Sequence, residues 1–100
     1  MAAAEDEVLA LVARLSASDT AFLTELGPLI LASLAHGISA DTRSFARIFE
    51  VSHALALREC VHLDADLGLL STKDRGDKSG RLFLRLTPAG IHLTAPEVAS

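Results

Sequence analysis

The sequence predicts a single small domain of the α+β class, mostly helical and carrying one two-stranded β-hairpin. A chain of 100 residues fits one domain. Before residue 67, apolar residues recur at helical spacing in four stretches, whereas residues 69–86 contain two short alternating stretches around a glycine-containing turn. Half of the residues are hydrophobic, which is enough for a core and excludes a disordered chain.

The first two predicted helices are the most apolar part of the chain. Residues 4–15 form the first, and residues 19–35 form a second that is apolar on nearly every side, as is typical of a buried or paired helix. Gly27-Pro28 should kink or split this helix near Leu26, because proline lacks an N–H and clashes with the preceding turn. We expect residues 1–17 to be a helical extension used for dimerisation and residues 18–100 to be the main domain.

Two shorter helices are expected next. Asp41 can cap a helix from Thr42 to Glu50, and Ser52 can cap another from His53 to about Asp66. Because only about two residues separate them, the two helices must cross sharply.

The predicted hairpin follows after Gly68. Its strands are Leu69 to Lys73 and Arg81 to Leu86, joined by a turn over residues 74–80. In the second strand the alternation predicts one inward set, Leu82, Leu84 and Leu86, and one outward set, Arg81, Phe83 and Arg85. Thr87-Pro88 predicts the start of a last helix that ends near Leu93.

This order of elements is that of a winged helix-turn-helix domain. Residues 31–52 resemble the first half of a MarR-type helix-turn-helix, residues 63–70 resemble the end of its recognition helix, and Leu-Thr-Pro-Ala-Gly at 86–90 resembles the motif after its wing. The resemblance covers residues 22–93. It departs from the family in a segment 63–68 that is one residue longer, and in a wing without an acid-x-arginine signature. The resemblance implies a DNA-binding transcription regulator.

Positive charge is concentrated in the predicted hairpin. The net charge of −4 argues against a protein that coats nucleic acid indiscriminately. Residues 73–85, however, carry five basic residues against two acidic ones, whereas the first forty residues carry one basic residue against five acidic ones. A basic wing is therefore expected on an otherwise acidic domain.

The expected DNA interface combines the start of the recognition helix with the wing. Side chains at that helix start read bases in the major groove, and the wing contacts the backbone. Arg58 can pair with a guanine edge, and His53 can reach a base or a phosphate. The candidate DNA-binding residues are Thr42, Arg43, Ser52, His53, Ala54, Leu57, Arg58, Lys73, Arg75, Lys78 and Arg81. We expect a repressor that binds a two-fold site on double-stranded DNA as a homodimer.

Leu55 and Leu57 support a different function. One of them should face outward, and an apolar surface suits a protein groove better than DNA. The alternative is therefore a winged-helix module that binds another protein and no DNA, which the acidic first forty residues also favour.

Other classes of function find little support in the sequence. Cys60 and His62 lie two residues apart on a helix, about 200° around its axis, so they cannot chelate one metal ion together. No nucleophile has an adjacent base, so we expect neither an enzyme nor a cofactor. The lone cysteine, the acidic N-terminus and the short apolar run of residues 26–35 predict a cytoplasmic protein without a signal peptide or membrane span.

Overall fold

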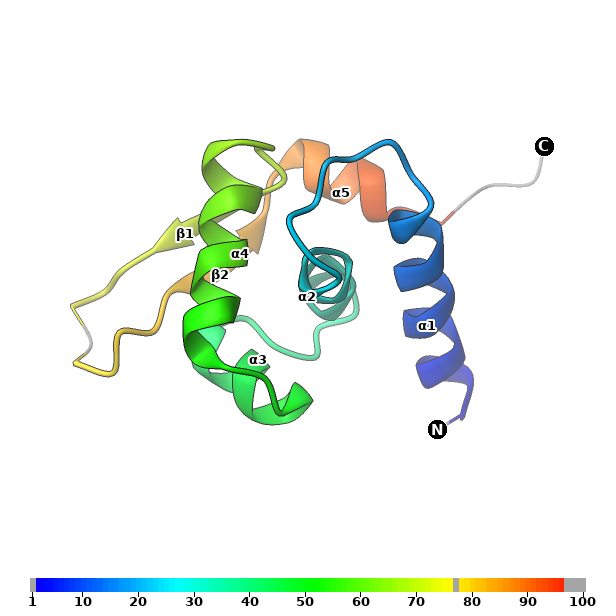
Figure 1. The fold of residues 1–100 in the computed structure, drawn as a ribbon. Helices are drawn as coiled ribbons and strands as arrows, with labels where there is room; N and C mark the ends of the chain where they lie inside the picture. Colours follow the sequence, from blue (N-terminus) through cyan, green and yellow to red (C-terminus); the bar gives the residue numbers. More distant parts are fainter. Residues whose placement is uncertain (1, 77, 97–100) are drawn as a thin grey trace.

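The computed structural model describes residues 2–76 and 78–96, which form five helices and one two-stranded antiparallel sheet (Figure 1). This confirms the α+β class, mostly helical with one hairpin. Met1, Asp77 of the predicted turn and residues 97–100 of the predicted domain lie outside the described residues. The elements are α1 (Ala2–Ser16), α2 (Leu26–Ala35), α3 (Thr42–Phe49), α4 (His53–Ala65), β1 (Leu70–Lys73), β2 (Phe83–Leu86) and α5 (Pro88–Thr94).

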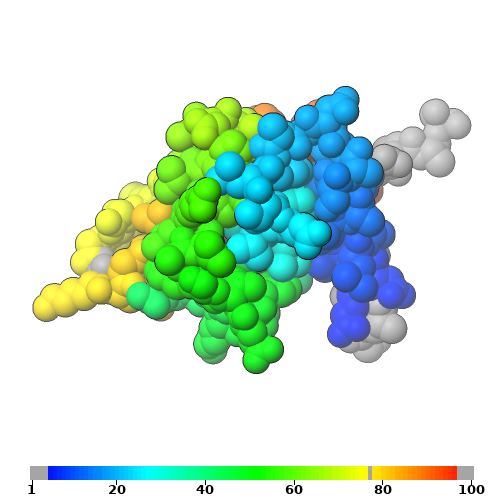
Figure 2. Space-filling view, viewed as in Figure 1, coloured from blue at the N-terminus to red at the C-terminus, as the bar shows by residue number. Residues whose placement is uncertain are grey.

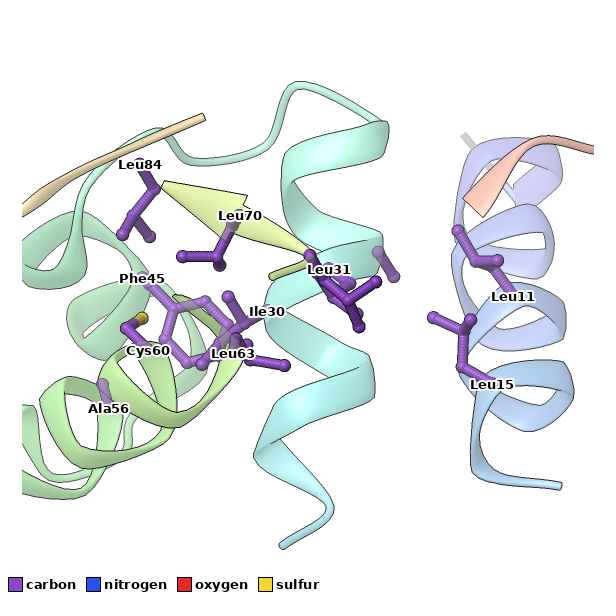
Figure 3. Packing of buried hydrophobic residues seen from close by; sticks show 12 residues of the cluster. Leu11, Leu15, Ile30, Leu31, Phe45, Ala56, Cys60, Leu63, Leu70 and Leu84 are labelled. Carbon is purple, nitrogen blue, oxygen red and sulfur yellow. The ribbon is translucent and has the colours of Figure 1, made fainter. Parts of the chain in front are cut away.

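Helix α2 lies at the centre of the core and is surrounded on most sides, which accounts for its nearly all-round apolar sequence. Ile30 lies beside Phe45 on one side of α2, and Leu11 and Leu15 of α1 point toward Leu31 on the other (Figure 3). All five side chains are buried. Helix α1, expected as an extension for dimerisation, therefore supplies part of the same core.

Arg14 fixes the end of α1 to the end of α5. Its Nη1 donates to the carbonyl oxygen of Leu93 at 3.1 Å, and its Nη2 donates to that of Ala95 at 2.8 Å. Because these carbonyls belong to the last turn of α5 and its C-terminal cap, the arginine occupies the place where a helix favours a cation.

The prediction of one helix over residues 19–35 is wrong in its first part, because α2 begins only at Leu26 and residues 17–25 form turns (the α1–α2 segment). The expected break near Leu26 is where the helix starts. Pro28 lies in the first turn of α2. An N–H in this turn has no acceptor within the helix, so the missing N–H of proline costs no helical hydrogen bond. Gly27 fits there because an added Cβ would lie 2.6 Å from the Phe22 ring.

His62 of α4 holds the α1–α2 segment through its imidazole ring. Its Nε2 lies 2.7 Å from the carbonyl oxygen of Ala21, and its Nδ1 lies 2.8 Å from the Asp66 carboxylate. Both ring nitrogens thus face acceptors, and only the protonated ring can donate to both. The Ala21 carbonyl, and after it the Asp66 carboxylate, raise the pKa of His62.

We expect His62 to make stability depend on pH. A raised folded-state pKa adds stability that is fully present below the ordinary pKa of about 6.5 and is lost as pH rises through the folded value. His53 acts in the opposite sense, because its pKa is lowered. Urea midpoints measured between pH 5 and pH 8 should therefore differ between wild type and His62→Gln most at low pH. His92→Gln, on the exposed surface of α5, should follow the wild type at every pH; parallel curves for His62→Gln and wild type would contradict the expectation.

Helices α3 and α4 begin at the predicted caps. The Asp41 Oδ1 accepts the N–H of Ser44 at 2.8 Å, and the Ser52 Oγ accepts the N–H of Leu55 at 3.4 Å. Between the helices, Glu50 has a φ of 54°, and this left-handed residue ends α3 and turns the chain toward α4. Each helix ends one residue earlier than expected.

The two strands pair from Leu70 opposite Leu86 to Lys73 opposite Phe83. They are shorter than predicted at their N-terminal ends, by one residue in β1 and two in β2. Leu84 is buried and Arg85 is exposed, as the alternation predicts. The prediction that Phe83 faces outward is only partly correct, because its ring is half-buried.

A third extended segment, directly before α3, adds to the free side of β2. The N–H of Leu84 donates to the carbonyl of Ala40 at 2.8 Å, and the N–H of Thr42 donates to the carbonyl of Leu82 at 3.0 Å. Asp41 lies opposite Phe83 in a single antiparallel bridge. Nothing in the pattern of residues 38–41 predicts this pairing, which ties the start of α3 to the hairpin.

Among the described residues, none of the helices has the length and apolar character needed to cross a membrane.

Candidate nucleic-acid interface

The first two turns of α4 lie beside the hairpin, on the side of the molecule away from α1 (Figure 1). Ser52, Ala54 and Arg58 are exposed there, and His53 is half-buried. Arg58 is the one arginine or lysine within α4. If a cation of this helix hydrogen-bonds to a guanine base, that cation is therefore Arg58.

Leu55, and not Leu57, is the leucine that faces outward. Leu55 is 50 % exposed, whereas Leu57, a candidate DNA-binding residue, is half-buried, which corrects the expectation that its side chain contacts DNA. Leu57 lies seven residues before Asp64 and therefore on the same flank of the helix. The hairpin covers that flank, because the Asp64 carboxylate accepts the N–H of Thr72 at 3.1 Å and its hydroxyl at 2.8 Å.

Thr42 is fully buried, so the expectation that its side chain contacts DNA is corrected. Its Oγ1 accepts the N–H of Leu82 at 3.0 Å and lies 2.8 Å from the Nε2 of His53. The hydroxyl thus joins the beginning of α3, the beginning of α4 and the approach to β2. Thr42 therefore positions these elements of the candidate interface from the core side and is not part of the exposed surface.

The imidazole of His53 is held in a weakly basic state. Burial lowers the pKa of His53, and the positive charge of Arg43 lowers it further. At neutral pH the ring is therefore uncharged, and it can offer DNA a hydrogen bond but no positive charge.

Arg43 and Arg81 connect α3 to the hairpin. The Arg43 guanidinium donates through Nε and Nη2 to the carbonyl of Ser79, with the Nε at 2.9 Å. The Arg81 Nε lies 3.7 Å from the Asp41 carboxylate. Burial alone would raise the pKa of Asp41, but the N–H and hydroxyl of Ser44 and the charge of Arg81 together lower it, so the carboxylate stays ionised.

A groove with basic walls runs between α3, the start of α4 and the approach to β2. Arg43, Arg47, His53 and Arg81 line it, and no acidic side chain among the described residues does. Arg47 is not among the predicted interface residues, although its spacing of four from Arg43 places the two on one face of α3. The groove can accept an anion such as a backbone phosphate.

The hairpin extends this basic surface away from the helices. Lys73, Arg75 and Lys78 are exposed, and the yellow segment between the two strands projects past α4 (Figure 2). The Arg75 guanidinium lies 4.1 Å above the centre of the Phe83 ring, which orders its side chain without using its hydrogen-bond donors. The predicted wing residues are thus brought to the same side as Arg43, which bonds to Ser79 of the hairpin, whereas Arg58 lines a pocket with Leu23 and Glu25. The acidic first turns of α1 lie toward the opposite end (Figure 1).

Neither a cluster of metal ligands nor an exposed thiol is found in the part of the chain that the structure describes. No three His, Cys, Asp or Glu side chains there lie close enough to hold a metal ion. Cys60 is buried in the core, and burial followed by the charge of Glu59 raises the pKa of its thiol to about 12. Such a thiol stays protonated and unreactive.

Comparison of the chain with protein-family models, with curated proteins and with solved structures gives no match.

Proposed function

We propose that this chain is a winged helix-turn-helix domain of the MarR-like type that binds double-stranded DNA and acts as a transcription repressor. The observation that carries the proposal is the gathering of cations on one side of an acidic molecule. The basic groove and the hairpin cations lie there, with the acids of α1 at the other end, and α4 adds the exposed Arg58. A local positive surface on a protein of negative net charge favours a defined DNA site over general coating.

Two features support the winged-helix arrangement in particular. The elements from α2 onward follow the expected order, with α3 and α4 joined by three residues and followed by the hairpin. In addition, the bridge between Asp41 and Phe83 attaches the start of α3 to the hairpin. A wing attached in this way keeps a fixed position relative to the recognition helix.

In the proposed complex, α4 enters the major groove with its first turns. Arg58 pairs with a guanine edge, and Ala54 contacts a thymine methyl group. Ser52 and His53 donate hydrogen bonds at the edge of the groove, while the half-buried Leu57 supports the helix against the hairpin.

The wing and the beginning of α3 hold the backbone. Lys73, Arg75, Lys78 and Arg81 contact phosphates along one strand, and Arg43 uses the donors that its bond to Ser79 leaves exposed. Two copies bound as a homodimer would place two α4 helices about one helical turn apart, and the occupied site would block transcription.

Fluorescence anisotropy with a labelled random-sequence duplex, measured across a salt series, tests the proposal. We expect affinity to fall steeply with salt, and the double variant Lys73→Ala with Lys78→Ala to reduce the slope of log affinity against log salt by about 2. Arg58→Ala should change this binding little but should cost about 1–3 kcal/mol on a duplex selected for tight binding. His92→Ala serves as the control on α5. A folded protein that binds no duplex at low salt would overturn the proposal.

The apolar side of α4 favours a second candidate function, that of a protein-binding module. Leu55 and Leu23 are both exposed and line one pocket between α4 and the α1–α2 segment. Arg58 and Glu25 also line this pocket, and their opposite charges would orient a partner. This function would be supported if the protein binds no DNA at low salt and if the Leu55→Asp variant loses binding to a partner protein.

A further inference from the structure

Exposed apolar side chains gather on a second face, which adjoins the candidate DNA interface at Arg47. Of the large hydrophobic residues that are exposed in the described chain, Leu9, Ile38, Ile48 and Ile91 line two neighbouring grooves that meet at Ile38. We call the surface formed by these four residues and the two grooves the Ile38 face. One of the two grooves lies between α1 and α3, where the space-filling view is hollowed (Figure 2).

The two grooves differ in charge. The groove beside α1 is lined by Glu5, and the same first turns of α1 carry Asp6 and Glu7. The groove beside β2 is lined by Arg47 and Arg85, with no acidic side chain among the described residues that line it. The Ile38 face therefore has an acidic end, an apolar middle and a basic end.

This arrangement is complementary to itself. A two-fold rotation about an axis near Ile38 places the acidic end of one copy on the basic end of the other, twice, and sets the apolar middles against each other. Monomeric proteins seldom leave so many large apolar side chains exposed together. A second copy would cover them and would satisfy both charged ends at once.

We propose that the Ile38 face is the homodimer interface of this protein and that its occupant is a second copy of the same chain in this isologous arrangement. The inference rests on the proposed function, which includes a homodimer, and it assigns the surface through which the two copies associate. Arg58, Lys73 and Lys78 line neither groove, so the dimer leaves them available for DNA, whereas Arg47 lines both the basic groove and the groove beside β2 and is shared by the two surfaces.

A mixing experiment tests the symmetry directly. One variant carries Glu5→Lys and Asp6→Lys, and the other carries Arg47→Glu and Arg85→Glu. Each variant alone should raise the dimer dissociation constant, measured by sedimentation velocity, more than about tenfold, because like charges then meet at both ends. An equimolar mixture should form a heterodimer with about wild-type affinity, because every acidic end again meets a basic one.

Restored association in the mixture also shows that both variants are folded. A monomeric wild type, unchanged dimers of the separate variants, or a mixture that stays monomeric while both variants keep the wild-type circular dichroism would each overturn the proposal.

A second pair of variants tests the apolar part. Leu9→Asp should give a folded monomer, since Leu9 is 65 % exposed and its replacement removes little from the core. Val61→Asp is the matched control, because Val61 is similarly exposed on α4 but lines neither groove; it should remain dimeric. A dimeric Leu9→Asp, or a monomeric Val61→Asp, would contradict the assignment.

The same measurements separate this inference from the proposed function. A wild-type dimer that responds to the variants but binds no DNA would overturn the function and keep the interface. DNA binding by a wild-type monomer would keep the function and overturn the interface.

Discussion

Replacement of Gly90 by alanine should destabilise the domain by about 3 kcal/mol, at the upper end of the usual cost of overpacking. A Cβ at this position would lie 2.9 Å from the carbonyl carbon of Leu69 and closer still to its oxygen. Both atoms belong to the backbone and cannot turn aside as a flexible side chain would. Gly90 does not have a positive φ, so the expected loss comes from the close approach of two segments and not from backbone conformation.

The close approach is built by the beginning of α5. The N–H of Thr87 donates to the carbonyl of Leu69 at 3.1 Å, and its hydroxyl donates to that of Gly68 at 2.6 Å. The same Oγ accepts the N–H of Gly90 at 3.1 Å and caps the helix. The first two of these bonds hold the start of α5 against the chain just before β1, so the alanine methyl group can be accommodated only by separating the two segments.

Gly68→Ala is the matched control, measured beside Gly90→Ala by urea unfolding. Gly68 has a φ of 64°, and an added Cβ would meet no atom within 4 Å. Its replacement should therefore cost only the strain of a left-handed residue, about 1 kcal/mol. A loss for Gly90→Ala no greater than that for Gly68→Ala would show that α5 moves away without cost.

The beginnings of the later helices could be predicted from the sequence because their caps are local. Asp41, Ser52 and Thr87 each accept an N–H from the residue three positions further along, and this pattern is visible in the sequence itself. The need for a glycine at 90 is not visible there. It depends on the approach of residue 69, which only the folded chain brings about.

The residues of the candidate interface likewise include some that the sequence predicts correctly and some that it does not. Exposed cations such as Arg58 and Lys73 follow from helix and hairpin patterns, because a charged side chain on an outward position stays in solvent. Thr42 was expected at the surface as a residue near a helix start. It is buried because its hydroxyl accepts the N–H of Leu82, forty residues away in sequence, and no local pattern carries that information.

Residues 19–25 depart from the predicted helix for a similar reason, and the residue responsible is Glu59. Its side chain is 1 % exposed and accepts the N–H of Leu23 at 3.3 Å, the N–H of Thr24 at 2.9 Å and the Thr24 hydroxyl. The Thr24 Oγ1 in turn accepts the N–H of Leu26, the first residue of α2, at 3.0 Å. A carboxylate of α4 thus caps α2 through Thr24, and it competes with continuation of the helix toward residue 19.

Glu59→Ala should accordingly lower the free energy of unfolding by about 3 kcal/mol, because charge-assisted bonds are lost and donors lose a buried acceptor. Glu59→Gln keeps one acceptor oxygen but turns an amide group toward an N–H, so we expect an intermediate loss. Glu25→Ala is the control, since Glu25 occupies the N-cap position of α2 without a side-chain cap bond and should change stability by less than about 0.5 kcal/mol. Urea unfolding gives the three values, and amide exchange at Leu23 and Thr24 should accelerate in Glu59→Ala but not in Glu25→Ala. If Glu59→Ala proved as stable as Glu25→Ala, the cap supplied from α4 would not be what ends the helix at Leu26.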